Sequence, residues 1–252
     1  MAARERKVIR GIVLRSVDTR EADKILTVLT GEMGKLAVVA KGARGRRSRV
    51  TAATQLLAYS EMTVAESRGW QILSEASTIE LFSGVRRDLE RLSLASYFAE
   101  LVDAVTYEDL PAPEILPLLL NALYALGNLN RPREIVKPAF EVKLMALSGF
   151  EPLVDRCAVC GAPEPEEPML DVVHGTLHCG KCAQRGGLSM PLGAAGLAAM
   201  RHIVYGEPKR LYAFQLPEEP LRWLNHAAEA YVAAQLERGF RTLEFYKQLK
   251  TD

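Results

Sequence analysis

The stretch DKILTVLTGEMGKLAVVA (Asp23–Ala40) decides the fold at the front of this chain. Two runs rich in Val, Ile, Leu and Thr flank a short segment with glycines at both ends, which is typical of two strands joined by a hairpin turn. The segment GEMGK (Gly31–Lys35) also resembles half of a phosphate-binding loop, but Leu36 stands where Ser or Thr is required. We therefore interpret it as a turn.

Similar strand-like segments occur throughout the first 80 residues. Predicted strands are Lys7–Ser16, Asp23–Thr30, Lys35–Ala40, Thr54–Glu66 and Trp70–Glu80. Five short strands in a segment of this length are typical of a small closed barrel, and the five-stranded barrel commonly used for oligonucleotide binding is the OB-fold. The pattern alone leaves an SH3-like barrel open.

Beyond Phe82 the hydrophobic period becomes helical, with apolar residues recurring at steps of three and four. After a first helix that carries Val85 to Val105 on one face, we predict helices at Pro113–Leu126, Lys137–Ser148, Ala194–Tyr205 and Glu219–Glu237. Their apolar faces need one another, so the helices before and after the cysteine segment should pack into one bundle.

The predicted fold class is thus α+β, with an OB-fold barrel followed by an α-helical bundle into which a cysteine module is inserted. The predicted domains are residues 1–80 for the barrel, 81–150 for the helical domain, 151–190 for the cysteine module and 191–252 for the helices that complete the helical domain.

All four cysteines fall in two C-x-x-C pairs, CAVC and CGKC, with 18 residues between the pairs. This spacing predicts two knuckles that converge on one tetrahedral Zn²⁺, with Cys157, Cys160, Cys179 and Cys182 as ligands. Gly161 and Gly180 let the backbone turn there. Four thiolates close the coordination sphere, so the zinc should be structural. The alternative is four buried or redox-active thiols.

Two histidines, His174 and His178, lie inside the same segment. Either could replace a cysteine ligand, but His178 directly precedes Cys179 and would share the ion with it only with difficulty. We expect both histidines to be surface side chains.

Positive charge is concentrated at the front of the chain. Residues 1–49 contain 13 Lys and Arg against 5 Asp and Glu, although the whole chain has a net charge of +1. The run Lys41–Arg49 contributes Lys41, Arg44, Arg46, Arg47 and Arg49. Such a run is either a solvated loop or a contact surface for a polyanion. Lys35 could extend the contact surface, as could Arg10, Arg15 and Lys24.

Other classes of protein are disfavoured. The charged N-terminus lacks the apolar run of a signal peptide, and Ile115–Leu129 is too short for a membrane span. We expect a cytoplasmic protein. Common hydrolase and deaminase motifs are missing from the sequence, so we expect no enzyme.

Four blocks together resemble the RecO family of bacterial recombination mediators. They are ADKILTVLTGEMGKLAVVAKGARGRRSR (Ala22–Arg49), FEVKLMALSGFEPLVDRCAVCG (Phe140–Gly161), LHCGKCA (Leu177–Ala183) and LERGFRTLEFYKQL (Leu236–Leu249). The resemblance implies an OB-fold, a helical domain and a zinc module. It also implies binding of single- and double-stranded DNA, strand annealing, and cooperation with RecR in loading RecA onto DNA coated by the single-strand binding protein SSB.

The resemblance further implies a docking site for the acidic, hydrophobic C-terminal tail of SSB. Such a tail needs an apolar groove edged by cations, and the stretch Arg131–Leu147 offers Arg133, Lys137, Phe140 and Lys143. For a helix in a bundle, Phe140 can equally be a core residue.

Few aromatic side chains are available for stacking on bases. In the first 80 residues only Tyr59 and Trp70 qualify, and Trp70 could be packed inside. We therefore expect DNA binding to depend on phosphate contacts. The alternative function is a zinc-containing OB-fold module that binds RNA or a protein partner, and a preference for RNA over DNA would distinguish it.

Overall fold

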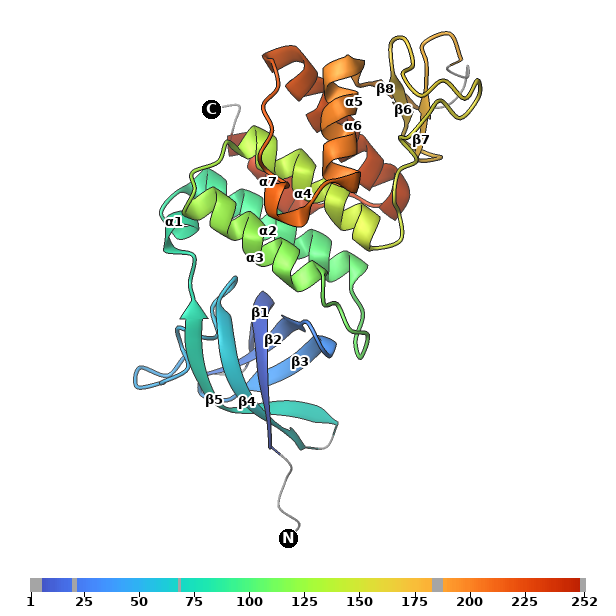
Figure 1. Ribbon diagram of the computed structural model, residues 1–252. Helices are drawn as coiled ribbons and strands as arrows, with labels where there is room; N and C mark the ends of the chain where they lie inside the picture. Colours follow the sequence, from blue (N-terminus) through green and yellow to red (C-terminus); the bar gives the residue numbers. More distant parts are fainter. Residues whose placement is uncertain (1–5, 20–21, 68, 183–187, 250–252) are drawn as a thin grey trace. The chain divides into compact units, whose positions relative to one another are not determined.

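The computed structural model of this chain describes residues 6–19, 22–67, 69–182 and 188–249 (Figure 1). The chain divides into two compact units, the first formed by Met1–Asn128 with Phe240–Asp252 and the second by Leu129–Gly239. None of the described helices is long and apolar enough to cross a membrane. The four-segment division proposed from the sequence stays a prediction.

Five strands of the first unit close into a barrel in the order β1-β2-β3-β5-β4 (Figure 1). Strand β1 pairs antiparallel with both β2 and β4, and the parallel pairing of β3 with β5 completes the closure. This arrangement confirms the predicted five-stranded OB-type barrel. The strands are β1 (Arg6–Thr19), β2 (Asp23–Thr30), β3 (Gly34–Ala40), β4 (Tyr59–Ser67) and β5 (Trp70–Glu80).

Alternate residues of the strands fill the barrel with one apolar cluster, to which β2 and β3 contribute Leu26, Val28, Leu36 and Val38. One predicted strand starts in the wrong place, since β4 begins at Tyr59 and not at Thr54. Thr54 lies in a turn, where its amide and its hydroxyl both donate to the carbonyl oxygen of Val50. The side-chain bond favours the turn over an extended strand.

The β2–β3 hairpin is fastened to the segment that follows the first long helix. The amide of Lys35 donates to the carbonyl oxygen of Tyr107 over 3.1 Å. Gly34 has a φ of +66°, and a Cβ atom at this position would lie 2.1 Å from the carbonyl oxygen of Leu110. Only glycine therefore permits this approach. The contact joins the barrel and the helices of the first unit.

The helices of the first unit are α1 (Ser83–Arg86), α2 (Leu89–Val105), α3 (Ile115–Gly127) and α7 (Arg241–Leu249). Asp88 starts α2 by accepting a hydrogen bond from the amide of Arg91. Helix α7, which the sequence pattern did not predict, packs against α2. The amide and hydroxyl of Thr242 both donate to Glu100, and Phe240 meets Tyr97 edge to face.

In the second unit, α4 (Arg133–Leu147) packs against α5 (Gly193–Tyr205) and α6 (Glu218–Leu236). The helices on either side of the cysteine segment therefore pack together, as predicted. The cysteine segment contains a three-stranded sheet in the order β7-β6-β8, with β6 (Met169–Asp171), β7 (Thr176–His178) and β8 (Ser189–Pro191). Strands of three residues are too short to show a period, so the sequence did not predict this sheet.

A buried ionic cluster joins α4 to α6. The ammonium nitrogen of Lys137 lies 2.8 Å from Oε1 of Glu141 and 3.1 Å from Oε2 of Glu229, and both Lys137 and Glu141 are buried. Burial lowers the pKa of Lys137, but the two carboxylates reverse the effect, and the net pKa is raised above its ordinary 10.5. The lysine is therefore charged inside the bundle.

Replacing Lys137 by Met is expected to destabilise the second unit by about 3–5 kcal/mol, because the buried charge of Glu141 loses the ammonium group that lies 2.8 Å away. Urea unfolding followed by the fluorescence of Trp223, in a Trp70→Phe background, measures this change. Arg222→Met, which removes an exposed cation from α6, is the control. An unfolding midpoint for Lys137→Met equal to that of the control would contradict the prediction.

The same cluster predicts a dependence on pH. Because the folded pKa of Lys137 is raised, its contribution to stability is complete below about pH 10.5 and is lost as the pH rises through the higher folded value. Measured from pH 8 upwards, this contribution to the unfolding midpoint should hold until about pH 10.5 and then fall in the wild type, while Lys137→Met stays flatter above that pH. Parallel curves for the two proteins would count against this assignment.

Candidate functional site

The four cysteine sulfurs meet at one point of the second unit, all within 4.8 Å of one another. The Sγ atom of Cys179 lies 3.9 Å from that of Cys157 and 3.8 Å from that of Cys160. A tetrahedral ion with Zn–S bonds of about 2.3 Å has sulfur–sulfur edges of about 3.8 Å, whereas a disulfide needs about 2.05 Å. The spacing fits a tetrahedral metal site.

Tight turns position the two cysteine pairs. Gly161 follows the first pair with a φ of +74°, and its amide donates to the carbonyl oxygen of Cys157 over 2.9 Å. Gly180 has no positive φ, and a Cβ atom there would meet the side chain of Glu167, whose Oε2 atom at 2.5 Å belongs to a flexible carboxylate that can move away. Of the two glycines that the sequence indicated, Gly161 is therefore the one whose backbone conformation favours glycine.

The pKa values of two of the thiols indicate that a bound cation would stabilise the cluster. Burial raises the pKa of the Cys157 thiol, but backbone amides of Cys160, Cys179 and Val159 donate to it and lower the pKa to about 6. At Cys182, hydrogen bonding to Cys179 and burial raise the pKa to about 12. Thiolates this close repel one another, and a cation bound between them would relieve the repulsion.

Arg201 of α5 clamps the loop that carries the first cysteine pair. Its Nε donates to the carbonyl oxygen of Val154 over 2.8 Å, and Nη2 donates to the carbonyl oxygens of Asp155 and Pro163. Its Nη1 lies 2.7 Å from Oε1 of Glu164. The carbonyl partners precede and follow the pair, so one guanidinium holds both ends of the knuckle. No sequence pattern indicated this role, because Arg201 is distant in sequence from both ends.

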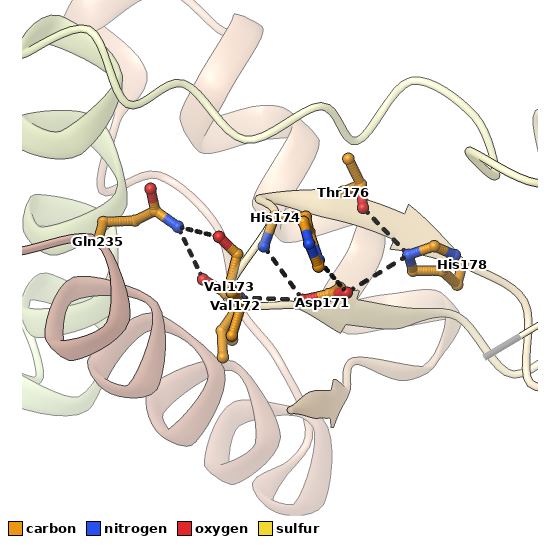
Figure 2. A network of polar contacts seen from close by, with 7 residues as sticks. All are labelled: Asp171, Val172, Val173, His174, Thr176, His178 and Gln235. Carbon is orange, nitrogen blue, oxygen red and sulfur yellow. Dashed lines mark hydrogen bonds and ion pairs between the residues drawn. The ribbon is translucent and has the colours of Figure 1, made fainter. Parts of the chain in front are cut away.

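The two histidines lie beside the carboxylate of Asp171, as Figure 2 shows, and do not belong to the cysteine cluster. His174 is exposed, with Nδ1 2.8 Å from Oδ2 of Asp171. His178 is buried, which makes the predicted surface position wrong for this residue, and its Nε2 lies 3.0 Å from Oγ1 of Thr176. Among the described residues, the side chains close enough to surround an ion are the four cysteines alone.

Asp171 and Gln235 hold the β6–β7 turn on both sides (Figure 2). The carboxylate of Asp171 accepts hydrogen bonds from the amides of Val173 and His174. From α6, Nε2 of Gln235 donates to the carbonyl oxygens of Val172 and Val173 over 2.8 and 2.9 Å. The hairpin that leads into the second cysteine pair is therefore fixed to the bundle.

In the first unit, the predicted basic run forms a loop after β3. Its cations are all exposed: Lys41, Arg44, Arg46, Arg47 and Arg49. The loop is also anchored, since Ala43 is fully buried in the barrel core and its carbonyl accepts a bond from the hydroxyl of Thr51. The amide of Gly42 donates to Oδ1 of Asp23. These contacts order the backbone of the loop.

The other predicted cations have different surroundings. The ammonium of Lys35 donates to both the carbonyl oxygen and Oδ1 of Asp103, and its side chain is only 17% exposed. Arg10 is exposed but lies 2.9 Å from Glu61. Lys35 therefore links β3 to α2 and does not belong to the exposed cationic surface.

The residues considered for the SSB tail lie mostly inside the second unit. Phe140 is fully buried, and Lys137 belongs to the buried ionic cluster. The ammonium of Lys143 donates to the carbonyl oxygen of Val204 over 2.9 Å, while Arg133 is half-buried. Buried side chains do not present a groove, so this geometry argues against a tail site centred on Lys137 and Phe140.

Comparisons with known proteins cover nearly the whole chain. The family described as Recombination protein O N terminal matches residues 5–82, and that described as Recombination protein O C terminal matches residues 86–244. A DNA repair protein RecO from Acetivibrio thermocellus is 35% identical over 242 residues, which are 95% of each chain. Another from Symbiobacterium thermophilum is 33% identical over 247 residues, 96% of this chain and 97% of the relative. This chain belongs to the RecO family of DNA repair proteins.

Proposed function

We propose that this protein is a DNA-binding recombination mediator that acts without catalysing a reaction. The observation that carries the proposal is the loop Lys41–Arg49, which presents five exposed cations on an OB-type barrel. Each cation that neutralises a phosphate releases counterions, so affinity arises without sequence preference. Such a surface accepts single and double strands alike and suits the annealing of complementary strands.

Membership of the family supports the proposed partners. In this proposal the protein acts in the bacterial cytoplasm at the nucleoid, binds RecR, and helps RecA to load onto single strands coated by SSB. Docking of the SSB tail belongs to the proposal without assigned residues, because Lys137 and Phe140 are buried.

We also propose that the cysteine cluster holds a structural Zn²⁺. Thiolate ligands favour Zn²⁺ among the abundant divalent cations, and the sulfur spacing matches its tetrahedral radius. With four sulfurs bound, the ion has no open position for water and supplies cross-linking alone. The ligands would be Cys157, Cys160, Cys179 and Cys182.

Changing the five loop cations to Ala is expected to weaken DNA binding and flatten its dependence on salt. Each lost phosphate contact removes about 0.7–0.9 from the slope of log affinity against log salt, so the slope should fall by up to about 4. Fluorescence anisotropy between low and moderate salt measures this. Annealing of SSB-coated complementary strands should fall in parallel.

The matched control removes exposed cations from the second unit through Lys209→Ala, Arg210→Ala and Arg222→Ala. Its DNA affinity and annealing rate should stay close to those of the wild type. Equal salt slopes for the wild type and the loop variant would remove the basis for the proposed function.

Purified protein is expected to contain one zinc ion per chain by atomic emission. Cys157→Ser or a chelator should lower the unfolding temperature of the second unit, measured through Trp223 in a Trp70→Phe background. The DNA affinity of the loop should remain, because the loop belongs to the first unit. A metal-free protein that melts like the zinc-loaded form would refute a structural zinc.

Arg201→Gln is expected to speed the loss of zinc to a coloured chelator, by about tenfold or more, because the first knuckle loses its clamp. Arg222→Gln, an exposed arginine on α6, is the control and should lose zinc at the wild-type rate. The prediction fails if the two variants release zinc equally fast.

A further inference from the structure

One row of residues crosses four adjacent strands of the barrel. Val17 of β1 lies opposite Ile25 of β2, Ile25 lies opposite Val39 of β3, and Val39 lies opposite Ile72 of β5. Their neighbours in sequence point into the core: Leu26, Val38 and Leu73. Because side chains alternate along a strand, the row faces outward, and three strand spacings give it a length of about 14 Å.

Trp70 extends this row. It lies two residues before Ile72 on β5, so both side chains are on the outer side of the barrel. Trp70 is 47% exposed and Val17 is 45% exposed, while Ile25 and Val39 are partly exposed. The outer side of a small antiparallel barrel is ordinarily polar where water covers it. An exposed apolar surface that includes a Trp indicates a contact with a partner.

The charges at the border of the row favour a polyanion as that partner. Arg15, on the same outer side as Val17, is exposed, and Lys41 follows Val39 by two positions and begins the cationic loop. Two acids beside the row are already engaged, since Asp18 pairs with Arg44 and Asp23 accepts the amide of Gly42. An apolar strip bordered by cations matches a chain that carries both phosphates and flat rings.

Single-stranded DNA has this combination of groups in an accessible form. Its bases are unpaired and can place their faces on aromatic and aliphatic side chains, while its phosphates reach the cations. In a duplex the base faces are occupied by stacking on one another, so only the phosphates are available. The strip and the loop therefore differ in what they can bind.

We propose that Val17, Ile25, Val39, Ile72 and Trp70 form a stacking surface for the unpaired bases of single-stranded DNA. The inference rests on the proposed DNA-binding function and adds to it a contact that distinguishes single strands from duplexes. Trp70 is the main stacking residue because its ring is the largest and the most accessible of the five. The aliphatic row extends the surface beside it.

The test uses the full chain with oligothymidylate and a DNA duplex of equal length. The sequence contains two tryptophans, so Trp223→Phe leaves Trp70 as the sole fluorophore. Its emission should be quenched by oligothymidylate and unchanged by the duplex. Trp70→Ala should weaken oligothymidylate binding about 5- to 150-fold and duplex binding less than about twofold, while Trp70→Phe keeps most of the affinity.

Tyr124→Ala is the matched control, because Tyr124 is a similarly exposed aromatic on α3, 50% exposed. It should bind both ligands like the wild type. Unchanged binding of oligothymidylate by Trp70→Ala overturns the stacking surface, and so does an equal loss for both ligands. A loss of self-association without a loss of single-strand affinity assigns the strip to a contact between copies and also overturns it.

The result separates this inference from the proposed function on which it rests. Salt-dependent duplex binding through the loop, together with an insensitive Trp70, rejects the stacking surface alone. A wild-type protein that binds neither ligand rejects both proposals.

Discussion

The approach of the β2–β3 hairpin to residues 107–112 determines how the first unit is built. Gly34 leaves room for the carbonyl oxygens of the segment, and Lys35 turns to Asp103 of α2. At this end of the strands even the outward-facing Leu29 is fully buried. Towards the other end, the outward-facing Ile25 and Val39 of the same strands are partly exposed. One contact thus divides the outer side of β2 and β3 into a structural part and an accessible part.

The sequence was sufficient wherever the controlling interactions are local. Runs rich in Val, Ile, Leu and Thr between turn residues predicted β2 and β5 to the residue, and the C-x-x-C spacing predicted the cysteine cluster. Gly161 after the first pair and Gly180 inside the second could also be recognised from the sequence, since a knuckle closes within a few residues. The start of β4 was predicted wrongly because residues from Thr54 onwards have a strand-like composition, whereas the hydroxyl of Thr54 donates to the carbonyl oxygen of Val50 and stabilises a turn.

Residues whose roles depend on distant partners could not be predicted in the same way. Lys35 and Lys41 look alike in sequence, yet Lys35 meets an aspartate 68 positions away and Lys41 remains exposed. Lys137 and Phe140 suggested a docking groove. In the structure Lys137 pairs with Glu229 of α6, which is 92 positions away, and both Lys137 and Phe140 are buried. Arg201 gave no signal at all. The tertiary fold decides whether a cation pairs with a carboxylate, holds a loop in place or stays exposed for a ligand.

The buried Ala43 has a consequence for the energetics of the cationic loop. Because the backbone is fixed at its middle, it loses less conformational entropy on binding than a free loop would. The exposed Lys and Arg side chains keep their rotamer freedom, so the positive charges can still move to meet phosphates. In the proposed complex, an ordered backbone with adaptable side chains lets the same loop serve a compliant single strand and a stiff duplex.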